Sequence, residues 1–226
     1  RNDFSRWLKA RSLYVLANLF RPYSVKDFKS PEQMREHMVD MIKEFRLNRG
    51  KGVIAQFNRN KLGITLNMKS EEGKTLLKTL VRRADILVEN FRPGTMERLG
   101  LSYEVLSKEN PRLIYTAISG FGRTGPNSSR PAYDNTGQAA GGLWSMNGYA
   151  DRPPVRVGTI IGDLAASLYA AIGTLAALRE AERGGEGQVV DVSQQDSVLT
   201  LTENAVVRYT TAGEVASPLG NDHPFV

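Results

Sequence analysis

A single acidic residue stands at the start of a long apolar segment. Asp163 follows Gly162, and the Leu- and Ala-rich stretch after it continues to about residue 183. An aspartate at the start of a helix is most often only a cap. The alternative is a carboxylate nucleophile in an apolar pocket, with backbone N–H groups nearby to receive an oxyanion. The residues alone leave both roles open.

Two polar stretches follow predicted strands, and a third, residues 58–61, precedes one. Residues 89–94 read ENFRPG and residues 119–126 read SGFGRTGP. Ligands of open α/β sheets bind at the C-terminal ends of strands, and an arginine pair such as Arg92 and Arg98 can hold phosphate there. Solvated loops fit these stretches equally well, since neither the GxGxxG spacing nor a Walker Lys-Ser/Thr pair is present.

Other chemistries lack the residues they need. The chain has no Cys, which excludes disulfides, a thiolate nucleophile and a Cys-ligated metal. His37 and His223 are the only histidines and lie far apart, so neither a Ser-His-Asp triad nor a His-rich metal site is expected. No apolar run of about 18 residues and no signal peptide are evident. We therefore expect a cytoplasmic protein that needs neither metal nor membrane.

The net charge of +6 is unevenly spread. Residues 1–61 hold 14 Lys and Arg against 6 Asp and Glu, whereas the remainder holds 16 against 18. Such a basic segment could bind nucleic acid, an anionic membrane or a polyphosphate cofactor, and it could equally be a solvated surface without a partner. It lacks a motif of interleaved aromatic and basic residues, so no nucleic-acid partner is expected.

The elements that would position these residues alternate between strand and helix. Helical spacing is expected within residues 1–20, and Ser30, Pro31 and Gln33 predict a capped helix that ends near residue 47, before a flexible connection at 49–52. This alternation at βαβ lengths predicts an α/β domain with a parallel sheet. Strands are expected at 64–68, 86–88, 113–118 and 188–192, and helices at 70–83, 103–108, 134–146, 163–183 and 193–211.

Six ordered blocks together resemble the family III CoA-transferases, the formyl-CoA and carnitine CoA-transferase group. The blocks read FNRNKLGITLNMKSEEGK, ADILVENFRPGTMERLGLSYEVL, NPRLIYTAISGFGRTGP, RPAYDNTGQAAGGL, PPVRVGTIIGDLAASLYAAIGTLAAL and GEGQVVDVSQQDSVL. They extend from Phe57 to about Ala205, which is nearly two thirds of the chain. The resemblance implies a Rossmann-like large domain with a parallel sheet, a smaller second domain, and two interlocked subunits.

The same resemblance assigns roles to residues. Asp163 would be the nucleophile that carries the acyl group and then CoA between a thioester and a small carboxylic acid, without a metal. Desolvation and exact placement would make the carboxylate competent, and water would have to be kept from the anhydride. The implied CoA contacts are Leu66, Lys69, Asn90, Phe91, Arg92, Arg98, Tyr133 and Asp134.

The chain also departs from the family pattern. The usual first strand and GPxA-like loop are not found, NDFSRW corresponds to a GDxxR segment, and residues 9–50 read as an insertion. The family's small domain and glycine-rich loop would lie beyond the last residue. The expectation is a large domain truncated at both ends, with a helical segment at 1–50, the Rossmann-like domain at 51–216 and the start of a linker at 217–226.

Three rival functions remain. An α-methylacyl-CoA racemase or acyl-CoA isomerase of the same fold needs two acid/base groups, and Tyr133 stands where such enzymes usually carry His. A non-catalytic CoA-binding subunit fits the absent segments. A basic nucleic-acid-binding protein is the third, and a salt-dependent DNA shift would distinguish it from proteins that CoA protects against heat.

Overall fold

The computed structural model describes the backbone of residues 25–222 and the side chains of residues 26–44 and 56–222. The chain divides into two compact units, residues 1–65 and 66–226. The helix expected within residues 1–20 lies outside the described residues, as do His223 and the last three positions. The predicted domain bounds at residues 50 and 216 stay predictions.

The first unit contains the short 3-10 helix η1 (Val25–Asp27) and one long helix, α3 (Pro31–Phe57). The predicted start of α3 is confirmed, because Gln33 donates its backbone N–H to Ser30 Oγ at 3.2 Å. Its predicted end near residue 47 is wrong, and the expected flexible connection at 49–52 is helical. Gly50 and Gly52 each cost about 1 kcal/mol relative to alanine in a helix, but unlike proline they keep every backbone hydrogen bond.

The strand predicted at 64–68 is not formed. Residues 61–67 have no regular structure, and the Ile64 side chain is 69% exposed. Asn67 competes with strand pairing, because its side chain accepts the backbone N–H of Lys69 and its carbonyl accepts that of Ser70. Such a local turn satisfies the backbone without a neighbouring strand.

A three-stranded parallel sheet forms the centre of the second unit, as the alternation of elements predicted. Its order is β1 (Ile86–Glu89), β2 (Ile114–Ser119) and β3 (Val189–Ser193). Ile86 pairs with Ile114, and Ser119 pairs with Ser193 at the other end. All three strands therefore end at one edge of the sheet, which is where ligands of such sheets bind.

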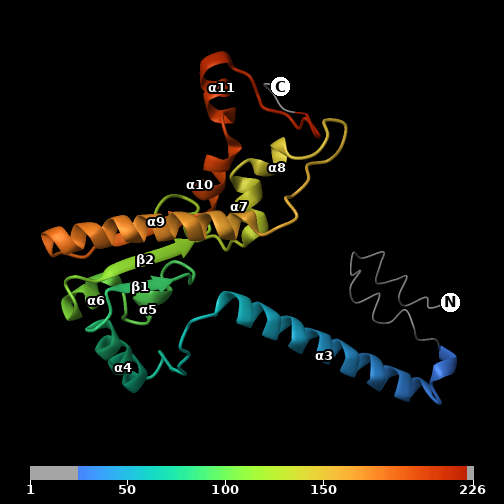
Figure 1. The fold of residues 1–226 in the computed structure, drawn as a ribbon, viewed down its shortest axis with the longest axis horizontal. Coiled ribbons are helices and arrows are strands. Elements are labelled where there is room, and N and C mark those ends of the chain that lie inside the picture. The colour runs from blue at the N-terminus through green and yellow to red at the C-terminus, as the bar shows by residue number, and fades with distance from the viewer. Residues whose placement is uncertain (1–24, 223–226) are drawn as a thin grey trace. The chain divides into compact units, whose positions relative to one another are not determined.

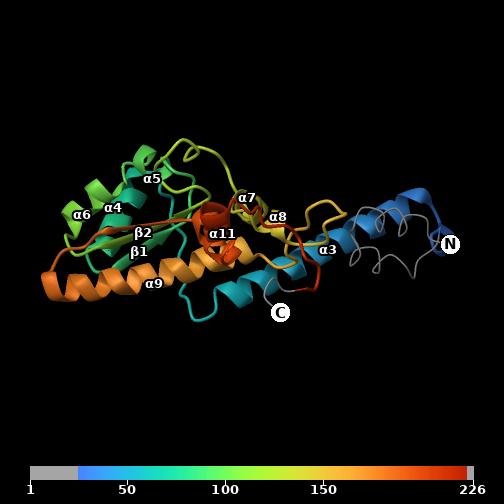
Figure 2. The same cartoon turned by 90° about the horizontal axis from the view of Figure 1, so that it is seen from above.

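One face of the sheet is covered by α4 (Glu71–Val81), α5 (Thr95–Arg98) and α6 (Tyr103–Glu109) (Figures 1 and 2). Ser70 caps α4 as predicted, since Gly73 donates its N–H to Ser70 Oγ at 3.1 Å. The short helix α5 was not predicted. Seven buried residues make the core on this face: Val81, Met96, Leu101, Leu106, Leu113, Tyr115 and Ala117.

The opposite face is covered by α9 (Ile161–Gly184) (Figure 2). Alanines let α9 approach the strands closely, and Thr174 Oγ1 lies 2.7 Å from Thr116 Oγ1 of β2. By length and composition, α9 is the one helix among residues 25–222 that could cross a membrane. The core helix of an α/β domain can have the same length and apolar composition. The side of α9 that faces the sheet is buried. The buried residues of α9 are Gly162, Ala165, Ala166, Ala170, Thr174, Ala177 and Ala181.

The two remaining predicted helices are each divided. Residues 134–146 form α7 (Asp134–Ala140) and α8 (Leu143–Met146), because Gly142 takes a φ of +85° that an α-helix does not allow. Residues 194–212 form α10 (Gln194–Leu199), η2 (Thr200–Thr202) and α11 (Ala205–Ala212), with Glu203 between them at a φ of +54°. Serine caps α10 as expected, because Ser193 Oγ accepts the N–H of Asp196 at 2.9 Å.

Candidate functional site

Three helices meet at the edge where the strands end. Helix α10 follows β3 without a loop, α7 begins after the long connection from β2, and α9 begins beside both (Figure 1). The first turns of these helices carry Gln194, Asp134 and Asp163 respectively. Side chains distant in the sequence are thereby brought to one place.

Asp163 lies in the first turn of α9 and is half-buried. Its Oδ1 accepts a hydrogen bond from Nε2 of Gln194. The first turn of a helix favours a carboxylate, because backbone N–H groups give this end a partial positive charge. Ile160, not Asp163, occupies the N-cap position, so capping does not explain the aspartate.

Asp134 is 8% exposed and lies behind the nucleophile candidate. Its Oδ1 accepts the backbone N–H of Gly162 at 2.9 Å, and its Oδ2 accepts Nε2 of Gln138 at 2.8 Å. Gly162 leaves little room for a side chain, since an added Cβ would lie 3.2 Å from Asp134 Oδ1. Asp134 therefore fixes the residue that precedes Asp163.

Gln138 is fully buried and holds the connection into α9. Its Nε2 also donates to the Thr159 carbonyl at 3.1 Å, while its Oε1 accepts Trp144 Nε1 at 3.1 Å and the Val157 N–H at 3.0 Å. A buried amide with these four bonds has all of its hydrogen-bonding capacity used. Hydrogen bonds through Gln138 therefore connect the chain segment that leads to Asp163 with α7 and α8.

The pKa of Asp163 is raised above its ordinary value of 3.8. Burial is the main cause, and the negative charge of Asp134 adds to it, while the hydrogen bond from Gln194 acts in the opposite direction. A desolvated carboxylate is a stronger nucleophile than a hydrated one. The surroundings are more polar than the apolar pocket that the sequence suggested.

A small hollow lies at the ends of β1 and β2, where Arg123 is held in place. The guanidinium of Arg123 pairs with Glu97 at 2.7 Å and lies 5.4 Å from the centre of the Tyr115 ring. Burial raises the pKa of Glu89 in the same hollow, and Ser119 Oγ is buried without a hydrogen-bond partner among the described residues. The hollow is lined by Glu89, Phe91, Arg92, Pro93, Gly94, Met96, Glu97, Ala117, Ile118, Ser119 and Arg123.

The predicted CoA contacts Phe91 and Arg92 line this hollow, with exposed Asn90 directly before them. Arg98 lies on the next turn, where its Nη2 donates to Thr95 Oγ1 at 2.9 Å. The structure therefore brings these four residues to one strand end. Their contact with CoA stays a prediction.

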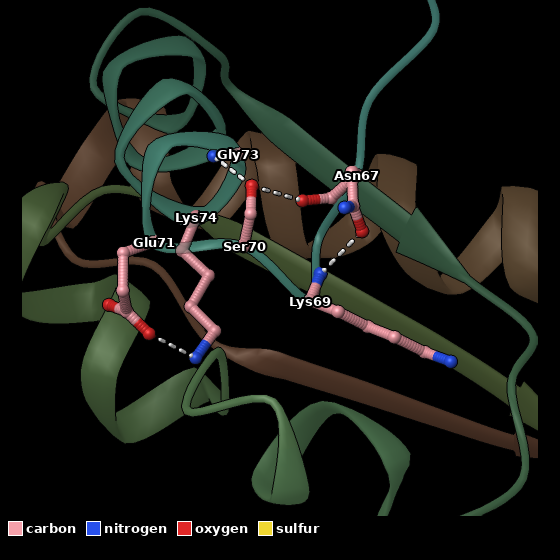
Figure 3. A network of polar contacts seen from close by, with 6 residues as sticks. All are labelled: Asn67, Lys69, Ser70, Glu71, Gly73 and Lys74. Carbon is pink, nitrogen blue, oxygen red and sulfur yellow. Dashed lines mark hydrogen bonds and ion pairs between the residues drawn. The ribbon is translucent and has the colours of Figure 1, made fainter.

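The predicted contacts Leu66 and Lys69 flank the turn before α4. Asn67 makes this turn, and Ser70 Oγ donates to the Asn67 carbonyl at 3.1 Å (Figure 3). The Lys69 side chain extends away from this network in Figure 3. Gly73 permits the close approach, since a Cβ there would lie 1.9 Å from the Asn67 carbonyl oxygen.

Tyr133 and Asp134 were predicted together as CoA contacts, and the structure places them differently. Tyr133 is 78% exposed at the N-cap position of α7, where it is accessible to a ligand. Asp134 is buried, and both of its carboxyl oxygens accept hydrogen bonds from within the protein. Its role in positioning Gly162 was not foreseen.

Sequence reasoning missed Gln138 and Gln194. The spacing of four residues between Asp134 and Gln138 is a local signal that could have indicated the first, because such residues meet on a helix face. Gln194 had no local signal, since it is 31 residues from Asp163. Within the described part of the chain, no group of three His, Cys, Asp or Glu could hold a metal ion. That no metal is needed stays a prediction.

Residues 27–226 match the family model described as CoA-transferase family III. Among curated proteins, the chain is 44% identical over 168 residues to a succinyl-CoA–D-citramalate CoA-transferase of Chloroflexus aurantiacus, covering 74% of this chain and 42% of that protein. It is also 44% identical over 170 residues to an acetyl-CoA:oxalate CoA-transferase of Acetobacter aceti, covering 75% and 44% respectively.

The chain is also similar to a solved structure, in fold as well as in sequence. The chain is similar to a CAIB/BAIF family protein from Brucella suis, with a TM-score of 0.71 and 38% sequence identity, over 74% of this chain and 44% of that one. The chain thus spans less than half the length of the relatives it matches.

Proposed function

The chain belongs to CoA-transferase family III, and from this we propose that it supplies the catalytic carboxylate of an enzyme that moves coenzyme A from an acyl-CoA thioester to a carboxylic acid. The relatives' names support this reaction class, since they act with succinyl-CoA or acetyl-CoA and with citramalate or oxalate.

One observation carries the assignment of the nucleophile. Asp163 is a half-buried carboxylate in the first turn of α9, held by Gln194 and preceded by a glycine that Asp134 fixes. Burial and orientation are what a carboxylate needs to compete with water as a nucleophile. We propose that one oxygen of Asp163 attacks the thioester carbonyl carbon of the donor.

The proposed cycle has two halves. Attack expels the CoA thiolate and leaves an acyl-aspartyl anhydride. The thiolate then attacks Cγ of Asp163, releasing the donor acid and leaving an aspartyl-CoA thioester. The acceptor carboxylate attacks the same Cγ, expels the thiolate and forms a second anhydride, and the thiolate finally takes the new acyl group and frees Asp163. Electrons and atoms balance without a redox partner.

We place CoA along the edge where the strands end. Arg92 and Arg98 offer positive charge at the end of β1, and Lys69 offers another at the turn before α4. Arginine side chains hold phosphate groups through paired, charge-assisted hydrogen bonds. The exposed ring of Tyr133 lies at the start of α7, next to Asp134, where an acyl or pantetheine chain would approach Asp163.

We also propose that the active form is a homodimer. An apolar stripe on α9 supports this, because Leu168, Ile172 and Leu175 are between 62% and 66% exposed. They are spaced by four and three residues, so they share one side of the helix, away from the alanines that face the sheet. Apolar patches of this kind are typical of protein–protein contacts.

The experiment that tests the function compares two conservative substitutions in the full-length protein. Asp163→Asn keeps the shape but removes the nucleophile, and should lower transfer from acyl-CoA to an added acid by at least ~10⁴-fold. Asp196→Asn changes an exposed aspartate of α10 and should leave transfer unchanged. Calorimetric CoA binding should survive in both, and near-normal transfer by Asp163→Asn would contradict the proposal.

A further inference from the structure

Gln194 is held tightly beside the nucleophile. It is the first residue of α10, immediately after the last residue of β3, so both a strand and a helix fix its backbone. Its side chain lies over Gly137 of α7, where an added Cβ would approach Gln194 Cβ to 2.9 Å. Its Nε2 donates to Asp163 Oδ1.

The two glutamines of this cluster differ in their bonding. Both Nε2 and Oε1 of Gln138 are satisfied, as expected of an amide that cross-links secondary structure. Gln194 Oε1, in contrast, is buried and has no hydrogen-bond partner among the described residues. Leaving a buried acceptor unsatisfied costs free energy, so such an atom calls for an explanation.

The orientation of the Gln194 amide follows from its partner. A carboxylate oxygen only accepts, so Asp163 Oδ1 requires the N–H of the amide and directs Oε1 elsewhere. The side chain therefore retains an unpaired oxygen in order to aim a donor at one oxygen of the nucleophile.

We propose that Gln194 Nε2–H is the oxyanion donor for every step in which Cγ of Asp163 is attacked. This inference rests on the proposed function, because it concerns the same carboxylate. Gln194 then has a second effect: it marks Oδ1 as the oxygen that stays on the aspartate and leaves Oδ2 to form the anhydride.

The charge on Oδ1 changes in the steps that pass through Cγ. When the thiolate sulfur bonds to Cγ, the π pair of the Cγ–Oδ1 double bond moves onto Oδ1, which becomes a full oxyanion. Collapse restores that double bond and expels the acyl group with Oδ2 as a carboxylate. Attack by the acceptor carboxylate creates the same oxyanion and expels the thiolate.

The first step of the cycle is different. When Asp163 Oδ2 attacks the donor thioester, the oxyanion develops on the acyl group of the donor, and Oδ1 loses negative charge. The hydrogen bond that a donor makes to Oδ1 therefore becomes stronger in the steps that pass through Cγ and weaker in this first step. Removing a single oxyanion donor typically costs ~10²–10³-fold in rate, so the steps should separate.

Two substitutions remove the donor while keeping an apolar side chain of similar length, Gln194→Leu and Gln194→Met. Gln195→Leu is the matched control, because the backbone N–H of Gln195, which the substitution keeps, donates to the Gly120 carbonyl, and the hydrogen bond to Asp163 comes from the side chain of Gln194. CoA binding measured by calorimetry checks that each full-length variant is folded.

Two rates report on different steps. Acid quench and intact-protein mass spectrometry follow the CoA adduct, which forms only through attack on Cγ. Acyl hydroxamate released when hydroxylamine is added with acyl-CoA follows the anhydride, which forms without such attack. The direct reaction of hydroxylamine with the thioester is subtracted with Asp163→Asn.

We expect at least one of the two Gln194 variants to fold, to form the CoA adduct ~100-fold or more slowly than wild type, and to release hydroxamate within about 3-fold of wild type. Adduct formation within about 3-fold, or an equal loss of both rates, would overturn the inference. A wild-type protein that gives neither product would overturn the proposed function itself, and the inference with it.

Discussion

Asp134 Oδ1 accepts a 2.9 Å hydrogen bond from the backbone N–H of Gly162, the residue immediately before Asp163. One buried carboxylate thus positions the backbone of the other, and its charge also raises the pKa of Asp163. Asp134 thus acts on Asp163 through geometry and through charge. These two effects can be separated by substitution.

Asp134→Asn should keep the acceptor for Gly162 but point an amide N–H₂ group at Nε2 of Gln138, whose own oxygen is already engaged. Two facing donors leave buried groups unsatisfied, so the free energy of unfolding should fall by about 1–3 kcal/mol. Loss of the negative charge should lower the pKa of Asp163 at the same time. Urea unfolding and the acid limb of the transfer rate measure these effects, and an unchanged acid limb would exclude the charge effect.

The transfer rate should fall on acidification with a midpoint above 3.8, because Asp163 must be ionised to attack and burial raises its pKa. The contribution of Asp163 to the free energy of unfolding changes with pH in the opposite direction to the transfer rate. Between pH 3.8 and the raised pKa, the folded protein binds more protons at Asp163 than the unfolded chain does, so this group's contribution to stability decreases as pH rises. Asp163→Asn should remove that contribution in urea unfolding at several pH values, and an unaltered pH dependence of stability would contradict the raised pKa.

Gly73→Ala should move the turn that precedes α4. The new Cβ would lie 1.9 Å from the Asn67 carbonyl oxygen, and backbone cannot yield as a flexible side chain would. Overpacking of this kind typically costs about 1–3 kcal/mol, and the displaced turn carries the predicted CoA contacts Leu66 and Lys69. Calorimetry should show weaker CoA binding, whereas Gly184→Ala, whose Cβ meets no atom within 4 Å, should bind normally. Equal affinity of both variants would remove this turn from the CoA site.

Much of the fold was predictable because its signals are local. Ser70 and Ser193 cap the helices that follow them, and the apolar runs at 86–88 and 113–118 are strands of a parallel sheet. The predictions failed where a local pattern was overridden by a nearby residue that favours a turn or a helix break. The alternating residues 64–68 gave way to a turn at Asn67, and Gly142 divided a helix that looked continuous.

The site was only partly predictable. Asp163 was identified by the resemblance of its block to a family, since an aspartate in a first helical turn has no distinctive local pattern. Gln194 contacts it only because the end of β3 and the start of α9 lie at the same edge of the sheet. Contacts of that kind depend on how distant elements pack, which the order of residues along the chain does not reveal.

The apolar stripe on α9 predicts how the full-length protein assembles. Ile172→Glu places a charge in the middle of three exposed apolar side chains and should convert a dimer to monomers, because a buried unpaired charge is costly. Arg183→Glu, near the end of the same helix, changes the charge by more and should leave the dimer intact. Light scattering after size-exclusion chromatography gives both masses, and a wild-type protein that is monomeric would contradict the proposed homodimer.

Covalent labelling tests the central claim most directly. Full-length protein is incubated with an acyl-CoA and hydroxylamine, digested, and mapped by mass spectrometry. Hydroxylamine that attacks Cγ of the aspartyl-CoA thioester converts Asp163 to a hydroxamate, so the peptide that contains Asp163 should carry that mass change, and Asp163→Asn should not. A label on a different residue, or full turnover without any label, would contradict the aspartyl mechanism and favour the racemase or the non-catalytic CoA-binding alternative.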